Sequence, residues 1–141
     1  MFKRILVAYD GSQHARKALE VAVDLAKKYG AKIYVAEVVD TATILGLSMG
    51  PVPPDIIDSM REKAKADLAD ARAKAEAAGV LVETAMLEGD PAAAIVEYAD
   101  KIGADLVVTG SRGLSSIKRV LLGSVSTGIV NHAKRPVLVV K

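Results

Sequence analysis

The sequence predicts an open α/β fold, with a parallel sheet and helices on both of its faces, on three observations. Five short runs rich in β-branched residues alternate with stretches of helical period along the chain. The runs are continuously aliphatic, which is typical of parallel strands buried on both faces. The 141 residues contain no internal repeat and no linker, so we expect one domain spanning 1–141.

Turn residues delimit the elements of the first half of the chain. The pair Asp10-Gly11 closes the first strand, and Gly30 stops the helix that follows. Two glycines and three prolines after Asp40 favour a loop. We therefore predict a strand at 5–9, a helix at 12–29, a strand at 33–39 and a loop at 41–54.

Caps and helix stops delimit the second half. A long apolar stripe of helical period starts after Asp55, the expected cap, and ends before Gly79. Asp90-Pro91 combines a cap with a proline at the first helical position, and Gly103 ends that helix. We therefore predict helices at 55–78, 91–102 and 124–133, and strands at 80–87, 106–109 and 137–140.

Composition excludes several classes of function. The net charge is only +2 and the basic residues form no block, so the electrostatic footprint of a nucleic-acid-binding protein is missing. Without cysteines the chain forms no disulfide, zinc-thiolate site or thiol nucleophile. No apolar run approaches the length of a membrane-spanning helix, and Lys3-Arg4 is not followed by a signal-peptide core. We expect a cytoplasmic protein with neither nucleic-acid nor membrane partners.

Two loops that follow strands stand out as candidate ligand contacts. One covers residues 9–12 after the first strand, and the other covers residues 110–113 after the fourth. In doubly wound sheets, ligands bind at the carboxyl ends of the strands, where the strand order reverses. If the sheet order is 3-2-1-4-5, these two loops face one crevice. The order itself is not visible in composition or periodicity.

Glycine and serine residues near the last helix predict an anion-binding site. Gly110 and Gly113 flank the second loop, and Gly123-Ser124 opens the last helix, where unpaired N–H groups and a partial positive charge favour phosphate. Ser126 adds a further hydroxyl. The alternative is ordinary loop chemistry, in which Gly110 ends a strand and Gly123 precedes a helix.

Three charged residues flank this candidate site. Asp10, at the end of the first strand, is suited to accept a ribose hydroxyl or to help hold Mg²⁺, and its alternative role is to cap the helix beside Ser12. Lys118 and Arg119 lie between the glycine pairs and are within reach of phosphate, although a solvated helix face accounts for at least one of them. The spacing is neither a Walker A loop nor the dinucleotide fingerprint, which would follow the first strand.

Four segments, taken in order, resemble the universal stress protein family over the whole chain. They are ILVAYDGS at the start, ADLVVTGSRG, LLGSVS and HAKRPVLVV at the end. The spacing of Gly110, Gly113, Gly123 and Ser124 is similar to the motif G-x2-G-x9-G-[ST] of the ATP-binding branch of that family. Glu37 is a modest departure, because it stands where many members have histidine.

The resemblance implies a Rossmann-like, five-stranded parallel sheet in the order 3-2-1-4-5, with ATP, ADP or AMP in the crevice and with or without Mg²⁺. Asp10 would contact ribose, and the backbone of Val38 would read adenine. The apolar edge strand would pair with its copy in a homodimer. The implied binding residues are Ala8, Tyr9, Asp10, Val38, Gly110, Arg112, Gly113, Gly123, Ser124, Val125 and Ser126. The implied dimer strand consists of Val137, Leu138, Val139 and Val140.

The sequence offers no evident catalytic constellation. His14 and His132 lie on separate predicted helices, and no serine–histidine–acid or metal-ligand spacing is evident. The resemblance therefore implies a nucleotide-dependent sensor or regulatory module in the stress response. The open alternatives are a slow ATPase or phosphotransferase, and an interaction scaffold that retains a structural nucleotide.

Overall fold

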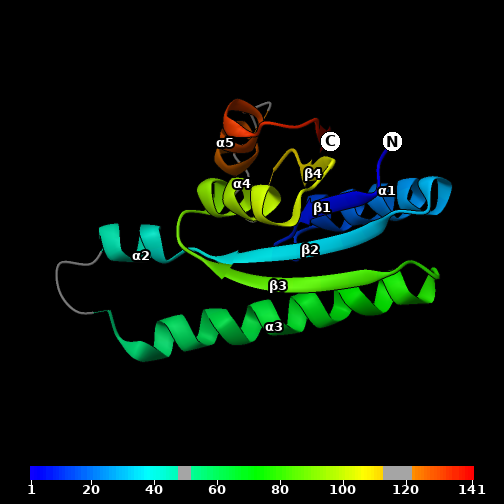
Figure 1. Cartoon of the computed structure of the whole chain (residues 1–141). Helices are drawn as coiled ribbons and strands as arrows, with labels where there is room; N and C mark the ends of the chain where they lie inside the picture. The colour runs from blue at the N-terminus through cyan, green and yellow to red at the C-terminus, as the bar shows by residue number, and fades with distance from the viewer. Residues whose placement is uncertain (48–51, 113–121) are drawn as a thin grey trace.

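The computed structural model describes residues 1–47, 52–112 and 122–141, which form a five-stranded parallel sheet with helices on both faces (Figure 1). The elements in chain order are β1 (Arg4–Ala8), α1 (Gln13–Tyr29), β2 (Lys32–Val39), α2 (Thr41–Leu47), α3 (Pro54–Ala77), β3 (Val82–Glu88), α4 (Pro91–Ile102), β4 (Leu106–Gly110), α5 (Ser124–His132) and β5 (Val137–Val140). The strand order is β3-β2-β1-β4-β5, and every pairing is parallel. The predicted fold class and strand order are confirmed.

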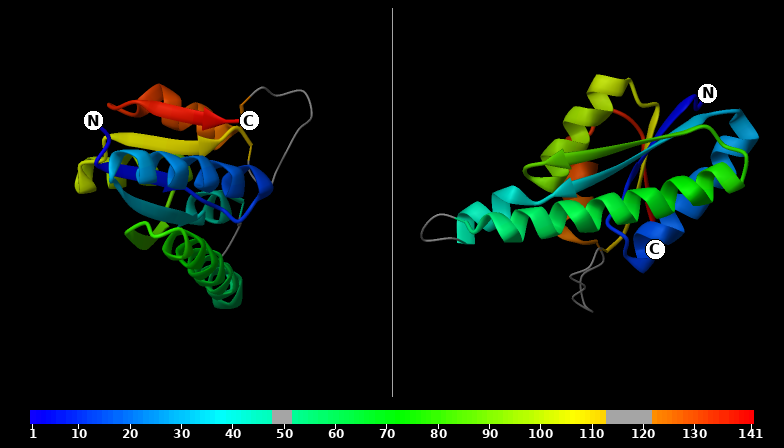
Figure 2. Two further views of the ribbon diagram at one scale, coloured as in Figure 1. Left: turned by 90° about the vertical axis from the view of Figure 1, so that its right-hand side faces the viewer. Right: turned by 90° about the horizontal axis from the view of Figure 1, so that it is seen from below.

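Two aliphatic layers hold the helices against the sheet. Helices α1 and α3 cover one face, where Ile5 and Val7 of β1 are buried, and α4 and α5 cover the other face (Figure 2). There Leu6 packs in one cluster with Ile95 of α4 and Ile129 of α5. Because alternate residues of a strand enter opposite layers, both sets must be apolar, which explains the continuous aliphatic runs.

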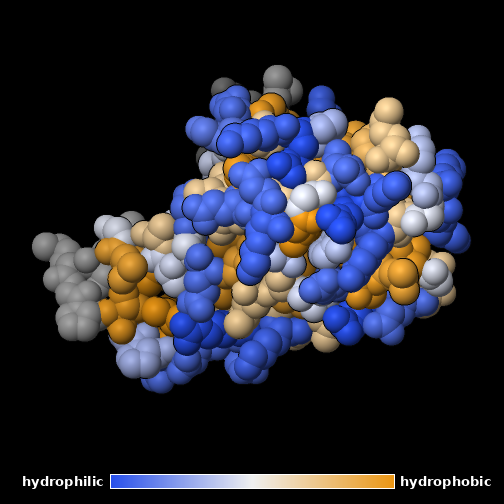
Figure 3. Space-filling model, viewed as in Figure 1, coloured by the Kyte–Doolittle hydropathy of each residue, from blue (hydrophilic) through white to orange (hydrophobic). Residues whose placement is uncertain are grey.

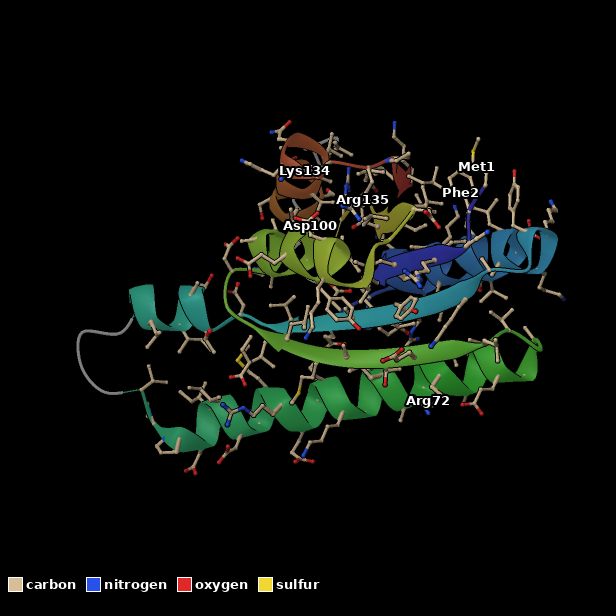
Figure 4. All side chains as sticks on the ribbon, in the orientation of Figure 1. Met1, Phe2, Arg72, Asp100, Lys134 and Arg135 are labelled. Atoms are coloured by element: carbon tan, nitrogen blue, oxygen red, sulfur yellow. The ribbon has the colours of Figure 1, made fainter. Side chains whose placement is uncertain are left out.

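A charged clamp fixes the C-terminal end of α4. The Arg135 guanidinium donates to the carbonyl oxygens of Ala99 and Ala104, each at 2.8 Å, and forms a 2.6 Å ion pair with Asp100 (Figure 4). These bonds satisfy carbonyl groups near the end of the helix. Because Arg135 lies two residues before the start of β5, these bonds form at the amino ends of the strands.

The prediction of a loop at 41–54 is wrong for its first part. Residues 41–47 form the helix α2 rather than the first part of a 41–54 loop. The Asp40 carboxylate explains the difference, because it accepts hydrogen bonds from the Thr43 N–H at 3.0 Å and from the Thr43 hydroxyl at 2.8 Å, and so caps the helix. Residues 48–51 of the predicted loop lie outside the described residues.

The start of α3 also differs from the prediction. Pro53 is the N-cap residue and makes no side-chain capping bond, whereas the predicted cap Asp55 lies inside the first turn. The later turns of α3 pack on the sheet, but Ile56 in the first turns is exposed. Leu45 of α2 is exposed as well. Figure 3 shows apolar surface in the region where α2 lies across from the start of α3. None of the described helices combines the length and the apolar character needed to cross a membrane.

Candidate functional site

A cavity of about 350 Å³ lies at the carboxyl ends of β1, β2 and β4. At this edge the sheet order reverses, because the chain runs from β1 to β2 and β3 on one side and returns to β4 and β5 on the other. In Figure 1 it is the edge toward which the arrows of β2 and β3 point. The predicted binding residues that line the cavity are Ala8, Tyr9, Asp10, Val38, Gly110, Arg112, Gly123, Ser124, Val125 and Ser126. Gly113, Lys118 and Arg119 lie outside the described residues.

The turn after β1 presents Asp10 to the cavity. Ser12 is the N-cap of α1, and its hydroxyl oxygen accepts a hydrogen bond from the Ala15 N–H at 3.2 Å. Asp10 Oδ1 accepts a hydrogen bond from the Ser12 N–H at 2.9 Å and so braces the turn. The capping role considered for Asp10 is therefore filled by Ser12.

The two glycine-flanked turns at the other end of the cavity are joined by hydrogen bonds. The Gly123 N–H donates to the Ser111 carbonyl oxygen at 2.6 Å, and the Ser111 N–H donates to the carbonyl oxygen of Val140 in β5 at 2.8 Å. The Ser126 hydroxyl lies 3.1 Å from the Ser111 carbonyl oxygen and 3.0 Å from that of Gly123. The single hydroxyl proton of Ser126 is used within this network, so its side chain braces the turns. The Ser126 hydroxyl was predicted to donate to an anion, but here it donates within the protein.

The N-terminus of α5 opens into the same cavity. Thr127 makes the first backbone bond of the helix, to the Gly123 carbonyl oxygen at 3.0 Å. The N–H groups of Ser124, Val125 and Ser126 precede it and have no acceptor within the helix. Three N–H groups at the positive end of a helix form a ready anion-binding site.

Two glycines of the predicted motif, Gly110 and Gly123, differ in whether the structure leaves room for a side chain. A Cβ atom on Gly110 would lie 2.8 Å from the backbone carbon of His14, so Gly110 allows α1 to pack closely against β4. A Cβ atom on Gly123 would meet the Ser111 carbonyl oxygen at 3.4 Å, which is an ordinary contact. Packing against α1 is thus a sufficient reason for the first glycine, whereas Gly123 has no such steric requirement.

The peptide groups of Val38 face the cavity beyond the end of β1. The Tyr9 N–H donates to the Ala36 carbonyl oxygen at 2.9 Å, so the Ala36 peptide groups point toward β1. The Gly89 N–H, on the other side, donates to Val39. Since residues two apart in a strand direct their peptide groups the same way, Val38 presents an N–H and a C=O side by side past Ala8, where β1 ends.

A buried carboxyl group lines the cavity at the end of β2. Glu37 is only 6% exposed, and its Oε1 atom has no hydrogen-bond partner among the described groups. Burial raises the pKa of this carboxyl group to about 8, and the adjacent Asp67 carboxyl acts in the same direction through a hydrogen bond and its charge. The Lys63 ammonium, 3.6 Å from Glu37 Oε2, opposes this rise without overcoming it.

Glu37, Asp40, Met60 and Lys63 also line the cavity, and sequence reasoning missed them as site residues. A signal for Glu37 was present, because a charged residue interrupts an otherwise aliphatic strand. No comparable signal exists for Lys63, which is one of many charged residues on α3. Its position in the site depends on where α3 crosses the sheet.

A family model described as the universal stress protein family matches residues 1–141. The chain belongs to the universal stress protein family. It is 39% identical over 150 aligned residues to the universal stress protein YxiE of Bacillus subtilis, with 100% of each chain covered. A solved universal stress protein from Burkholderia pseudomallei matches with a TM-score of 0.80 at 33% identity, covering 99% of this chain and 96% of the other. A solved universal stress protein in complex with cAMP matches with a TM-score of 0.73 at 32% identity, covering 99% and 97%.

The resemblance inferred from the sequence is therefore confirmed at the level of the family. The described part of this universal stress protein holds no group of three or more histidine, aspartate or glutamate side chains arranged to bind a metal ion. Asp10 is the only carboxylate predicted to approach Mg²⁺, and it would do so together with the oxygens of a bound nucleotide.

Proposed function

We propose that this protein binds ATP in the cavity at the carboxyl edge of the sheet and acts as a cytoplasmic, nucleotide-dependent regulatory module in the stress response. The observation that carries the proposal is the convergence of Asp10, the Val38 peptide groups and the N-terminus of α5 on one cavity. The cAMP complex of the relative at 32% identity supports an adenine nucleotide as the ligand class.

The base and the ribose fit the end of the cavity near β2. An adjacent N–H and C=O at Val38 match the N1 acceptor and the N6 amino donor of adenine. Apolar side chains of Ala8, Met60 and Ile95 supply the walls that a planar base requires. The carboxylate of Asp10 lies between this end and α5, where it is suited to accept ribose hydroxyl hydrogen bonds.

The phosphates fit the end formed by α5 and the turn after β4. The N–H groups of Ser124, Val125 and Ser126, which have no acceptor within the helix, and the hydroxyl of Ser124 are suited to donate there, and Arg112 adds a positive charge to the lining. A triphosphate reaches both the helix terminus and the turn, which is why we propose ATP rather than AMP.

The proposal is tested by identifying what the purified protein carries and what it binds. Mass analysis of small molecules released by denaturation should show an adenine nucleotide. Calorimetry with ATP, ADP, AMP, cAMP and GTP, each with and without Mg²⁺, should give the tightest binding for ATP and weak binding for GTP. Asp10→Ala should weaken all adenine nucleotides. Absence of binding by every nucleotide would overturn the proposal.

The fate of ATP bound to the purified protein distinguishes a regulatory module from an enzyme. A regulatory module should retain intact ATP over hours, with phosphate release no faster than the uncatalysed background. Steady phosphate release that disappears in Asp10→Ala, with the fold intact, would instead identify a slow ATPase.

We also propose a homodimer that forms through the outer edge of β5. In the described sheet β5 pairs only with β4, and its apolar sequence Val137-Leu138-Val139-Val140 forms an edge. Pairing with a second copy would cover this edge and its unpaired peptide groups. Sedimentation at micromolar concentration should therefore show a dimer.

The backbone of β5 suggests a sharp test of this dimer. The carbonyl oxygens of Pro136 and Val140 accept hydrogen bonds from the β4 side, so the peptide groups of Val139 point outward. Val139→Pro removes one outward N–H and leaves the bonds to β4 intact, which an edge strand tolerates. The variant should be a folded monomer, and an unchanged dimer would show that the copies meet elsewhere.

A further inference from the structure

Lys63 joins α3 to the turn that carries Asp10. Its Nζ atom donates to the backbone carbonyl oxygen of Asp10 at 3.0 Å and to Asp67 Oδ2 at 2.6 Å, and it lies 3.6 Å from Glu37 Oε2. An ammonium group has three N–H donors, and three acceptors from three different segments surround this one. Lys63 is therefore already engaged within the protein, although it lines the cavity.

The turn itself is shaped to receive this side of α3. Gly11 has a φ of +76°, and a Cβ atom at this position would lie 2.7 Å from Asp67 Oδ1. The Asp67 carboxylate thus rests directly against the backbone of the turn. Because the Asp10 carbonyl oxygen and Gly11 both touch the Lys63–Asp67 pair, α3 fixes the position of the turn from the face opposite α4 and α5.

We propose that Lys63, held by Glu37 and Asp67, is a positioning residue that sets Asp10 for its contact with the bound nucleotide. This inference rests on the proposed function, since it concerns the same cavity. We call the three side chains Glu37, Lys63 and Asp67 the α3 clamp. The clamp acts on the ligand through Asp10 and makes no contact with phosphate.

The α3 clamp is sensitive to protons. The charged groups that face Glu37 are Asp67 and Lys63 from α3 and Asp10 from the turn after β1. Burial and the Asp67 carboxyl raise the pKa of Glu37 to about 8, so near neutral pH the clamp holds one negative and one positive charge. Burial lowers the pKa of Lys63, but the hydrogen bond to Asp67 and the nearby carboxylates outweigh it, so the ammonium form persists.

The hydroxyl group of Tyr9 lies close to the α3 clamp and faces further charged groups. This buried hydroxyl has a raised pKa, first because of burial, and it faces Arg16 of α1 and Asp67 and Asp70 of α3. When Glu37 ionises, the carboxylates of Glu37 and Asp67 compete for the Lys63 ammonium group, which weakens its hydrogen bond to the Asp10 carbonyl oxygen. Nucleotide affinity should therefore fall as the pH rises through the titration of Glu37.

A double-mutant cycle tests the positioning role. Lys63→Met should weaken ATP and AMP by the same factor, about tenfold, because ribose positioning is common to both ligands. Lys63→Arg should retain most of the affinity, since a guanidinium group keeps the positive charge and has enough N–H donors for both the Asp10 carbonyl oxygen and Asp67. In an Asp10→Ala background, Lys63→Met should have little further effect, because its influence passes through Asp10.

The matched control is Lys74→Met on the same helix. Lys74 forms an exposed ion pair with Asp70 at 3.3 Å, also at i,i+4, and does not line the cavity. It should bind ATP within about twofold of the wild type. If Lys63→Met unfolds the chain, the double variant Asp67→Asn with Lys63→Met serves in its place, because it also removes the carboxylate that Lys63→Met leaves without its 2.6 Å partner.

The pH profile supplies a second readout that a purely structural lysine would not move. From pH of about 7.5 upward the phosphates keep a constant charge, and wild-type affinity for AMP should still fall severalfold by pH of about 9. Glu37→Gln should remove this fall. Unchanged affinity in Lys63→Met, loss for ATP alone, or full additivity with Asp10→Ala would each overturn the inference while leaving the proposed function standing. A wild-type protein that binds no nucleotide would overturn both.

Discussion

At the α5 end of the cavity the polar groups of the lining are mainly backbone N–H groups, whereas at the α3 end the charged groups are side chains from β2, α3 and the turn after β1. The α5 end consists of peptide N–H groups held in place by Ser111, Gly123 and Ser126. The α3 end depends on Glu37 and Lys63, which meet only because α3 crosses β2.

This difference means that the two ends of the cavity should respond differently to pH. Backbone groups carry no titratable proton, so the α5 end should bind phosphate in the same way across the neutral pH range. The α3 end contains a carboxyl group with a raised pKa beside an ammonium group, so its charge depends on pH. One ligand would then be held by a constant site at one end and by an adjustable site at the other.

The largest expected effect is on stability and comes from Gly110, at the end of β4 where the cavity's α5 end begins. Gly110→Ala would place a Cβ atom 2.8 Å from the backbone of His14, so α1 must shift away from β4. We expect a loss of about 2–4 kcal/mol of unfolding free energy, measured by urea denaturation. Gly123→Ala is the matched control, because its Cβ atom meets only an ordinary contact at 3.4 Å, and it should lose less than about 1 kcal/mol. Equal losses would contradict the different roles assigned to the two glycines.

A smaller expected effect concerns the pH dependence of the unfolding free energy, and it tests the protonation of Glu37 at the α3 end. The folded protein keeps a proton on Glu37 up to pH of about 8, whereas the unfolded chain releases it near the ordinary value of 4.5. Between these values the folded state binds more protons, so unfolding free energy must fall as the pH rises. Glu37→Gln should remove this fall, which we expect to be on the order of 2 kcal/mol.

The measurement is a series of urea titrations from pH of about 5 to about 9. Glu62→Gln provides the control, because Glu62 forms only an exposed ion pair with Lys65 on the same helix and should keep the wild-type profile. A wild-type profile retained by Glu37→Gln would show that Glu37 ionises normally in the folded protein.

The same contrast explains what could be predicted from the sequence. The strands were visible because each is buried on both faces and reads as an aliphatic run, and the helix stops at Gly30 and Gly103 adopt left-handed conformations as expected. The strand order came from the family resemblance, since neither composition nor periodicity encodes which strands are neighbours. The α2 helix was missed because its capping by Asp40 was hidden beside a glycine- and proline-rich stretch.

For the site, the spacing of glycines and serines singled out residues that line the α5 end of the cavity. Those residues lie within two short segments, so their local pattern carries the information. The α3 clamp could not be found in this way, because Glu37, Lys63 and Asp67 come together through tertiary packing. Side-chain contacts between distant elements leave no spacing that a motif would record.

A third prediction tests the two ends of the cavity separately, by comparing ATP with adenosine, which lacks the phosphates. Gly123→Val should weaken ATP binding by about tenfold or more, because the branched side chain crowds the Ser111 turn and the start of α5. The extended backbone at Gly123, with φ −71° and ψ 168°, accepts valine without strain, so the fold should persist. Adenosine should bind Gly123→Val as it binds the wild type. Calorimetry with both ligands decides, and a parallel loss for adenosine would place the base at the α5 end.

The smallest expected effect concerns α2, which borders the α3 end through Asp40. Asp40→Ala removes the hydrogen bonds to Thr43, but α2 is largely exposed, so global unfolding free energy should fall by less than about 1 kcal/mol. Amide exchange across residues 43–46 should accelerate by about tenfold, as the segment opens without the rest of the chain. Asp90→Ala is the matched control, because Asp90 caps α4 through Ala93 and α4 packs on the sheet, so its loss should appear in global stability. If both variants lowered global stability equally, α2 would unfold with the core, and the two ends of the cavity would be equally rigid.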